Sequence, residues 1–273
     1  MNISKINELT SLRGIAAISI VIHHFFLSIS PDLGVRVTGL TNYVSQSYLW
    51  VDMFFLLSGF VLTIRYHNRL TLQPYDIKNF VLARFARIYP LHFVILVLFL
   101  IIEVVKYQNN GEFLNSPNSF PDLMRNLFLL QGIQFDYLHT SWNHPSWSIS
   151  IEWFSYLLFP IILIIASKNH FTISLTLTVC SILFIYIVSN ITEYELDVTG
   201  ILGLVRCISE MVIGSILAII IHRMSLKLRS LISHPGVTLC VVIALFTGMH
   251  FDWSDLIIVL IMATLIAILG CSG

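Results

Sequence analysis

Charged residues are scarce in this sequence. Lys, Arg, Asp and Glu together make up 11% of its 273 residues, whereas an ordinary soluble domain carries roughly 25%. Hydrophobic residues account for 56% of the chain. A chain with so few charges cannot cover a large surface that faces water, so the composition predicts an integral membrane protein.

An excess of either charge sign is also missing. The chain has 15 basic and 15 acidic residues, which argues against nucleic acid as a partner, because such proteins carry a basic excess. Cysteines are few and lie in apolar stretches without the spacing of metal ligands, so we interpret them as packing residues and expect no metal site. They are Cys180, Cys207, Cys240 and Cys271.

No internal repeat, low-complexity run or soluble domain interrupts the chain. The N-terminal stretch "MNISKINELTSLRG" has no small-residue cleavage site, so we expect the first apolar segment to be retained. Residues 1–273 are therefore expected to form a single transmembrane domain.

Long apolar runs are what the sequence has in abundance. A spanning helix needs roughly 20 mostly apolar residues, and eight segments qualify, which predicts an all-α, polytopic transmembrane helix bundle. The segments are 9–30, 48–66, 88–106, 147–167, 171–190, 200–222, 232–250 and 255–271. A further stretch, 120–135, is too short to cross and is expected to form an interfacial or re-entrant helix.

The distribution of Lys and Arg predicts the orientation of these spans. Basic residues concentrate between spans two and three, between spans four and five at Lys168, and between spans six and seven at 223–229. Cytoplasmic loops carry such an excess. With eight spans, all these loops fall on the cytoplasmic side and both termini lie inside; counting 120–135 as a ninth span would break the agreement.

Several ionisable residues lie within the predicted spans. A charge at this depth costs at least a few kcal/mol, so it is expected to face the bundle interior and to serve a function. At 1.5 Å per residue, most of these groups fall in the outer half of the membrane and Arg13 falls near the cytoplasmic side. The outer or central groups are His24, Asp52, Glu103, Glu152, Arg206 and Glu210. This arrangement predicts a polar chamber that opens outward.

Helical spacing brings some of these groups onto common faces. Arg13 and His24 are 11 residues apart, which leaves them only about 20° apart around the helix axis and three turns apart along it. His23 points about 100° away, so we expect it to be a packing residue. Ser148 and Glu152, like Arg206 and Glu210, are separated by four residues and share a face.

Four motifs, in order, resemble the acyltransferase 3 family, membrane enzymes that transfer acyl groups to carbohydrate or other hydroxyls. "LRGIAAISIVIHH" contains the family's arginine, ten residues and histidine. "VDMFFLLSGFVL" at 51–62 is similar to its second span, "RFARIYP" at 84–90 to the loop before its third, and "WSISIE" at 147–152 to its Ser-x-Ser-x-Glu element. "RCISEMVIG" at 206–214 is a looser match. The family's C-terminal Gly-x-x-Ser-Tyr-x-x-Tyr-Leu-x-His stretch has no counterpart, so we expect a shorter or truncated form.

The resemblance implies a reaction and roles for these residues. Acyl-coenzyme A is the expected donor substrate, with no tightly bound cofactor, and a carbohydrate or glycolipid hydroxyl is the expected acceptor.

His24 is expected to act as the general base, since the pKa of imidazole lies near the working pH. The other expected catalytic residues are Arg13, Asp52 and Glu152. Arg84, Arg87 and Arg13 are expected to bind the donor. The residues expected to bind the acceptor are Ser148, Ser150, Trp142, Arg206 and Glu210. The expected location is the inner (cytoplasmic) membrane, in contact with lipid.

Each of these residues also has a simpler interpretation. His24 at such a position can join helices through hydrogen bonds, and Arg13 can extend to the cytoplasmic interface. Arg84 and Arg87 satisfy the orientation rule whatever they bind. Ser148 and Glu152 can bond neighbouring helices, and Trp142 can belong to an interfacial aromatic belt. The sequence leaves direct transfer and an acyl-enzyme on Ser148 as alternatives.

The sequence is also compatible with two other classes of function. A proton-coupled transporter also keeps His, Asp, Glu and Arg within its helices, although no repeated half or matching pair of broken helices is visible here. A non-catalytic membrane subunit would bind a partner without consuming a thioester.

Overall fold

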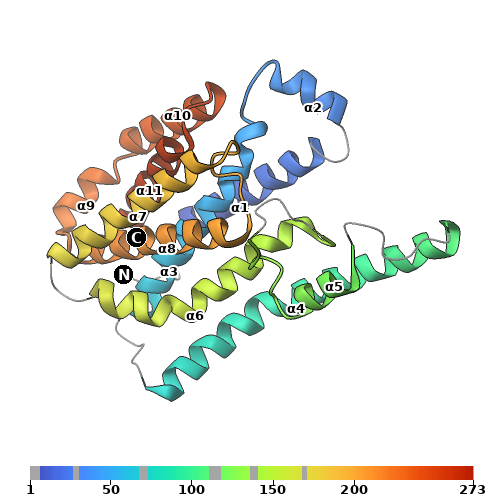
Figure 1. Cartoon of the computed structure of the whole chain (residues 1–273). Coiled ribbons are helices and arrows are strands. Elements are labelled where there is room, and N and C mark those ends of the chain that lie inside the picture. The colour runs from blue at the N-terminus through green and yellow to red at the C-terminus, as the bar shows by residue number, and fades with distance from the viewer. Residues whose placement is uncertain are drawn as a thin grey trace. The chain divides into compact units, whose positions relative to one another are not determined.

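The computed structural model describes residues 7–26, 31–67, 73–110, 118–135, 141–167 and 171–272, so Lys168 lies outside the described residues. The described residues form helices joined by short loops and contain no strand (Figure 1). This confirms the predicted all-α class. The helices are α1 (Asn7–His24), α2 (Pro31–Thr38), η3 (Ser45–Leu49), α3 (Trp50–Tyr66), α4 (Pro74–Asn110), α5 (Phe120–Leu127), η4 (His144–Ser146), α6 (Trp147–Ser167), α7 (Phe171–Ile191), α8 (Gly200–Arg223), α9 (Leu226–Ile232), α10 (Pro235–His250) and α11 (Asp255–Cys271).

Each of the eight predicted spans corresponds to one of these helices. By length and apolarity, five helical stretches in the described part of the chain can cross a membrane alone, and a sixth arises if α9 and α10, bent by 48°, count together. α11 is apolar but has 17 residues. The polytopic bundle is therefore confirmed, and the count of eight spans is approximate.

The third span was predicted to begin too far along the chain. Helix α4 starts at Pro74 rather than at 88 and has 37 residues, which gives a length of about 55 Å. Arg84 and Arg87, expected in a loop, lie within it. Proline at the first helical position is favourable, and Phe80, whose ring stacks on Phe159 at 5.6 Å, anchors the added turns.

The predicted interfacial helix at 120–135 is confined to α5. Its N-cap is Ser119, whose side chain accepts a hydrogen bond from the Asp122 backbone N–H. The helix has eight residues, about 12 Å, and ends before Leu129, which has a left-handed backbone with φ 58°. The segment up to residue 135 continues as turns, and α5 alone is far too short to cross.

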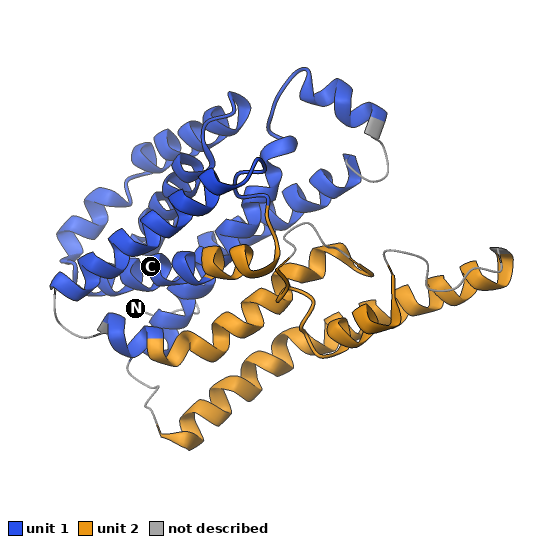
Figure 2. Cartoon of the chain, in the orientation of Figure 1, with its two compact units in different colours: residues 1–69, 162–197, 208–273 blue, residues 70–161, 198–207 orange. Residues whose placement is uncertain are grey.

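The chain divides into two compact units (Figure 2). Unit 1 consists of residues 1–69, 162–197 and 208–273. Within it α11 packs against α1, α3, α7, α9 and α10. Helices α3 and α8 approach so closely that a Cβ on Gly59 would overlap the Met211 carbonyl oxygen, and one on Gly214 would overlap that of Leu56.

Unit 2 consists of residues 70–161 and 198–207. It contains α4, α5, the first part of α6 and the first turns of α8, and α5 packs against α4. The turn that follows α5 lies against α6, because a Cβ on Gly132 would be 2.7 Å from the Trp147 carbonyl oxygen. The assignment of residues 1–273 to one functional domain stays a prediction.

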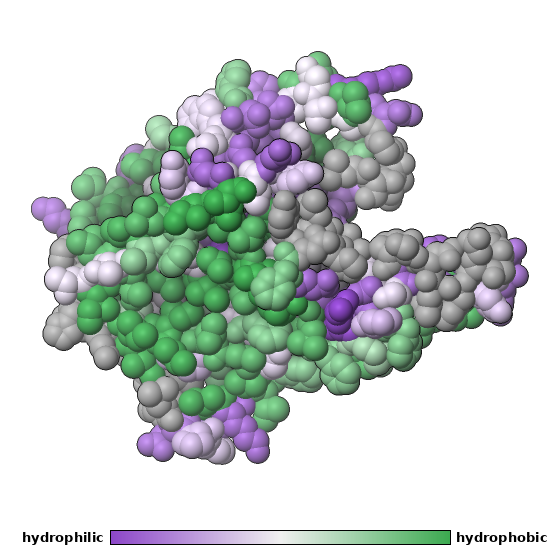
Figure 3. All heavy atoms as spheres, viewed as in Figure 1, coloured by the Kyte–Doolittle hydropathy of each residue, from purple (hydrophilic) through white to green (hydrophobic). Residues whose placement is uncertain are grey.

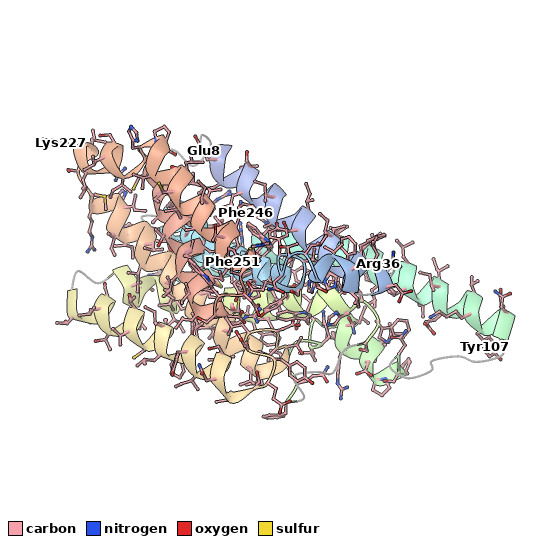
Figure 4. The ribbon with its side chains drawn as sticks, turned by 90° about the horizontal axis from the view of Figure 1, so that it is seen from above. Glu8, Arg36, Tyr107, Lys227, Phe246 and Phe251 are labelled. Atoms are coloured by element: carbon pink, nitrogen blue, oxygen red, sulfur yellow. The ribbon has the colours of Figure 1, made fainter. Side chains whose placement is uncertain are left out.

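Apolar side chains cover much of the visible surface, and hydrophilic residues gather toward helix ends (Figure 3). On α7, for example, Leu175, Val179, Leu183 and Ile187 are each about half exposed, as expected for helices that face lipid. Within unit 1, Glu8 and Lys227 lie toward one end and Arg36 and Phe251 toward the other (Figure 4). The predicted topology requires such a separation, because it places Glu8 and Lys227 on the cytoplasmic side of the membrane and Arg36 and Phe251 on the outer side.

Candidate active site

His24 is the last residue of α1 and its side chain is half-buried. One face of this helix is a buried stripe at helical spacing: Leu9, Leu12, Ala16, Ser19 and His23. Arg13 and His24 lie beside that stripe and are both partly exposed. Because α1 is continuous between them, they share a face and are about 16 Å apart along the helix axis.

His23 holds the end of α1 against the loop before η3. Its ring is 5% exposed, and its Nδ1 donates a hydrogen bond to the Val44 carbonyl oxygen at 2.7 Å. A carbonyl can only accept, so this contact assigns the proton to Nδ1. The His23 ring meets His24 edge-on at 5.3 Å and Tyr48 at 6.3 Å. The prediction that His23 is a packing residue is confirmed.

Asp52 lies in the first turn of α3 and is fully buried. Helix α1 packs against both α3 and η3, so Asp52 belongs to the same helix pair as His24. Carboxylates are stabilised at this position by the partial positive charge of a helix N-terminus. Arg13, His24 and Asp52 therefore lie in unit 1, on two helices that pack against each other.

A second group of polar residues lies in unit 2, around the start of α6. Ser150 is fully buried; its hydroxyl donates to the Leu129 carbonyl at 2.6 Å and accepts from the Gly132 N–H at 3.0 Å. These contacts stabilise the turn after α5, including the left-handed residue Leu129. The structure thus gives Ser150, expected to bind acceptor, a function in holding this turn.

Ser148 and Glu152 occupy one face of α6, as their spacing predicts, and both are half-buried. The Ser148 hydroxyl donates to the Pro145 carbonyl at 2.9 Å, within the turn that starts the helix. Glu152 accepts a hydrogen bond from the Tyr156 hydroxyl at 2.5 Å. Of the two, Glu152 presents the polar group better suited to orienting a substrate hydroxyl, because carboxylate oxygens accept several hydrogen bonds.

Trp142 and Arg206 are buried rather than displayed at a surface. Trp142 is 5% exposed and its indole N–H donates to the Ser119 carbonyl at 3.1 Å, which joins the segment before η4 to the cap of α5. The guanidinium of Arg206, 1% exposed, lies over the Trp147 ring at 5.5 Å. Glu210, one turn further along α8, is fully buried in unit 1.

The two arginines of the "RFARIYP" motif differ in environment. Arg84 is buried and its guanidinium lies 5.9 Å from the centre of the Phe80 ring, whereas Arg87 is exposed. An exposed arginine offers its planar fork to phosphate oxygens. Arg87 is therefore the more accessible of the two for a phosphorylated donor.

One buried network was not predicted from the sequence. Tyr48 in η3 and Asp255 at the start of α11 are joined by a hydrogen bond, and Asp255 also accepts from the Leu196 N–H at 2.8 Å. Asp255 is fully buried. The sequence does show that Asp255 directly precedes an apolar run, which marks it as a candidate buried carboxylate. Its partner Tyr48 could not be found in this way, because the two residues are 207 positions apart in the chain.

Comparison with known proteins identifies the family. The sequence profile of the acyltransferase 3 family, described as "Acyltransferase domain", matches residues 6–273. The chain belongs to the acyltransferase 3 family. The match begins just before α1, which carries Arg13 and His24, and extends beyond the 9–165 region in which the four motifs are found.

Three relatives share parts of the sequence. "Acyltransferase MdmB" of Streptomyces mycarofaciens is 32% identical over 58% of this chain and 39% of its own length. An "Uncharacterized protein" of Haemophilus influenzae is 27% identical over 66% of this chain and 77% of its length. "Protein 2 in picA locus" of Rhizobium radiobacter is 35% identical over 43% of this chain and 53% of its length.

The chain thus spans less than half of MdmB and about half of the Rhizobium protein. No solved structure matches this chain. Membership of the family therefore rests on the sequence match.

Proposed function

We propose that this chain is a multi-pass O-acyltransferase of the cytoplasmic membrane, which transfers an acyl group, acetyl in the simplest case, from acyl-coenzyme A to a carbohydrate or glycolipid hydroxyl. The observation that carries the proposal is the half-buried His24, on one face of α1 with Arg13 and in the same helix pair as the buried Asp52. In a member of an acyltransferase family, that arrangement supports general base catalysis.

The proposed reaction balances without a further reagent. The imidazole of His24 takes the proton of the acceptor hydroxyl while that oxygen attacks the thioester carbonyl. The carbon–oxygen bond forms, the carbon–sulfur bond breaks, and the imidazolium returns its proton to the thiolate of coenzyme A. Asp52 and Glu152 are proposed to stabilise or orient the groups that carry charge, and Arg87, Arg84 and Arg13 to bind the donor.

The test is release of free coenzyme A from acetyl-coenzyme A by the purified full chain in detergent, with and without a crude glycan acceptor. Wild type is compared with His24→Ala, and we expect at least about a 100-fold loss, the usual contribution of a general base. The control is His234→Asn, which keeps the acceptor that caps α10 and is expected to leave turnover unchanged.

Either of two results overturns the proposal in a distinct way. Full activity in His24→Ala removes the base assignment. Absence of turnover in a wild-type protein shown by its melting transition to be folded argues for a transporter or a non-catalytic subunit, both of which bind without consuming a thioester.

A further inference from the structure

A side chain that performs chemistry from the end of a helix needs support from outside that helix. His24 is the last α-helical residue of α1, and residues 25–26 continue the chain as a π-helical turn. The regular α-helical hydrogen bonds therefore change at His24, and such turns within or at the end of helices depend on their surroundings. Catalytic geometry tolerates only about 0.5 Å of displacement. The contacts around His24 in unit 1 show what supplies this support.

The first contact is the His23 ring. It meets the His24 ring edge-on at 5.3 Å and is itself fixed by the hydrogen bond from Nδ1 to the Val44 carbonyl. One turn earlier, the hydroxyls of Ser19 and Tyr43 are 2.7 Å apart. Two successive turns of α1 are therefore bound to the loop that precedes η3.

The η3 helix that follows this loop is in turn fixed through Tyr48. The Tyr48 ring packs edge-on against His23 at 6.3 Å, and its hydroxyl donates to the two carboxylate oxygens of Asp255 at 2.8 and 2.9 Å. Asp255 is fully buried and also accepts the Leu196 N–H at 2.8 Å. A buried carboxylate that is hydrogen-bonded from two elements is a rigid anchor, since removing either bond leaves a desolvated oxygen.

We propose that Tyr48 and Asp255 are positioning residues for the reaction at His24. Asp255 orients the Tyr48 ring, Tyr48 and Val44 hold the His23 ring, and His23 limits the motion of His24. The inference rests on the proposed acyl transfer and deepens it by assigning a function to two residues that lie outside the family motifs described above.

Gln46 provides a matched control within the same short helix, η3. Its amide donates to Asp252 at 2.7 Å and to the Trp253 carbonyl at 3.1 Å. Gln46 thus joins η3 to the connector before α11, whereas Tyr48 joins η3 to the first residue of α11. Neither of these bonds involves a histidine ring. If only the attachment of η3 mattered, Gln46→Leu and Tyr48→Phe would have equal effects.

The experiment measures kcat and KM for acetyl-coenzyme A in the full chain. Tyr48→Phe keeps the ring and removes the hydroxyl; we expect kcat to fall about 10-fold, because small misplacements of a reacting group have effects of this size, with KM unchanged. Gln46→Leu is expected to retain wild-type kcat. Asp255→Asn keeps an acceptor for the Tyr48 hydroxyl and is expected to retain more activity than Asp255→Leu.

A second readout does not depend on turnover. In protein labelled with ¹⁵N-histidine, the protonated Nδ1 signal of His23, assigned through His23→Gln, is expected to shift or broaden in Tyr48→Phe and to stay unchanged in Gln46→Leu. Unchanged kcat together with an unchanged His23 signal in Tyr48→Phe would overturn the positioning assignment. Failure of the acyl transfer itself is recognised separately, because the wild type would then show no turnover that depends on His24.

Discussion

Gly59 of α3 lies directly against Met211 of α8, in unit 1. A Cβ built on Gly59 would overlap the Met211 carbonyl oxygen, which is backbone and cannot rotate away. The reverse contact is equally close, since a Cβ on Gly214 of α8 would overlap the Leu56 carbonyl oxygen. Ser215 adds a hydrogen bond of 3.3 Å to the Gly59 carbonyl. Small residues thus allow the two backbones to touch, as is common between membrane helices.

Replacing Gly59 by Ala is therefore expected to force the two helices apart. Overpacking of this kind costs about 1–3 kcal/mol or more, which will appear as a lower melting temperature of the purified protein. Gly14→Ala is the control, because among the described residues no neighbouring atom lies within 4 Å of the position that its Cβ would take. Alanine is also better than glycine in a helix by about 0.5–1 kcal/mol. An unchanged melting temperature in Gly59→Ala would show that α3 and α8 do not pack backbone to backbone.

Arg84 and Arg87 are expected to differ in what they contribute. Arg87 is exposed, so Arg87→Gln should raise KM for acetyl-coenzyme A about 10-fold through loss of a charge-assisted bond to phosphate, without changing the melting temperature. Arg84 is buried beside Phe80, so Arg84→Gln should lower the melting temperature. Lys78→Gln, which removes another basic residue of the same helix, is the control; an equal rise in KM there would indicate a general charge effect.

His67 is expected to make stability depend on pH. Burial of its ring, together with the positive charges of His222 and Arg223, lowers the pKa of His67 below its usual value of about 6.5. The folded protein therefore binds this proton less tightly than the unfolded chain, so acidification through about pH 6.5 destabilises it and the effect vanishes above that pH.

The measurement is the melting temperature at several pH values from about 7.5 to about 5.5, on either side of the usual histidine pKa. Wild type should melt at a lower temperature as the pH falls, and His67→Gln should lose part of this dependence. His234→Asn serves as the control, since it removes another histidine of unit 1 but keeps the α10 cap. Identical pH dependence in wild type and His67→Gln would contradict the prediction.

The helices and the family could be predicted from the sequence because both depend on local information. In lipid every backbone N–H and C=O group must form its hydrogen bond within the helix, so an apolar run of sufficient length directly indicates a membrane-spanning helix. The spacing of Arg13 and His24 likewise follows from the helical repeat. The predicted start of α4 was wrong because the prediction relied on apolar content, whereas residues 74–87 are less apolar and still helical. The contact of Phe80 with Phe159 in this part of the helix lies outside what such a pattern reports.

The sequence by itself therefore determined the class of this protein, its main helices and the residues that define its family. Only the tertiary structure decided which polar residues are engaged in holding the fold, such as Ser150 and Trp142, and which lie around the His23 ring beside His24. The physical reason is distance along the chain: Tyr48 and Asp255 are 207 residues apart, and Ser215 and Gly59 are 156 apart. Such contacts form only when helices pack, and no local pattern encodes them.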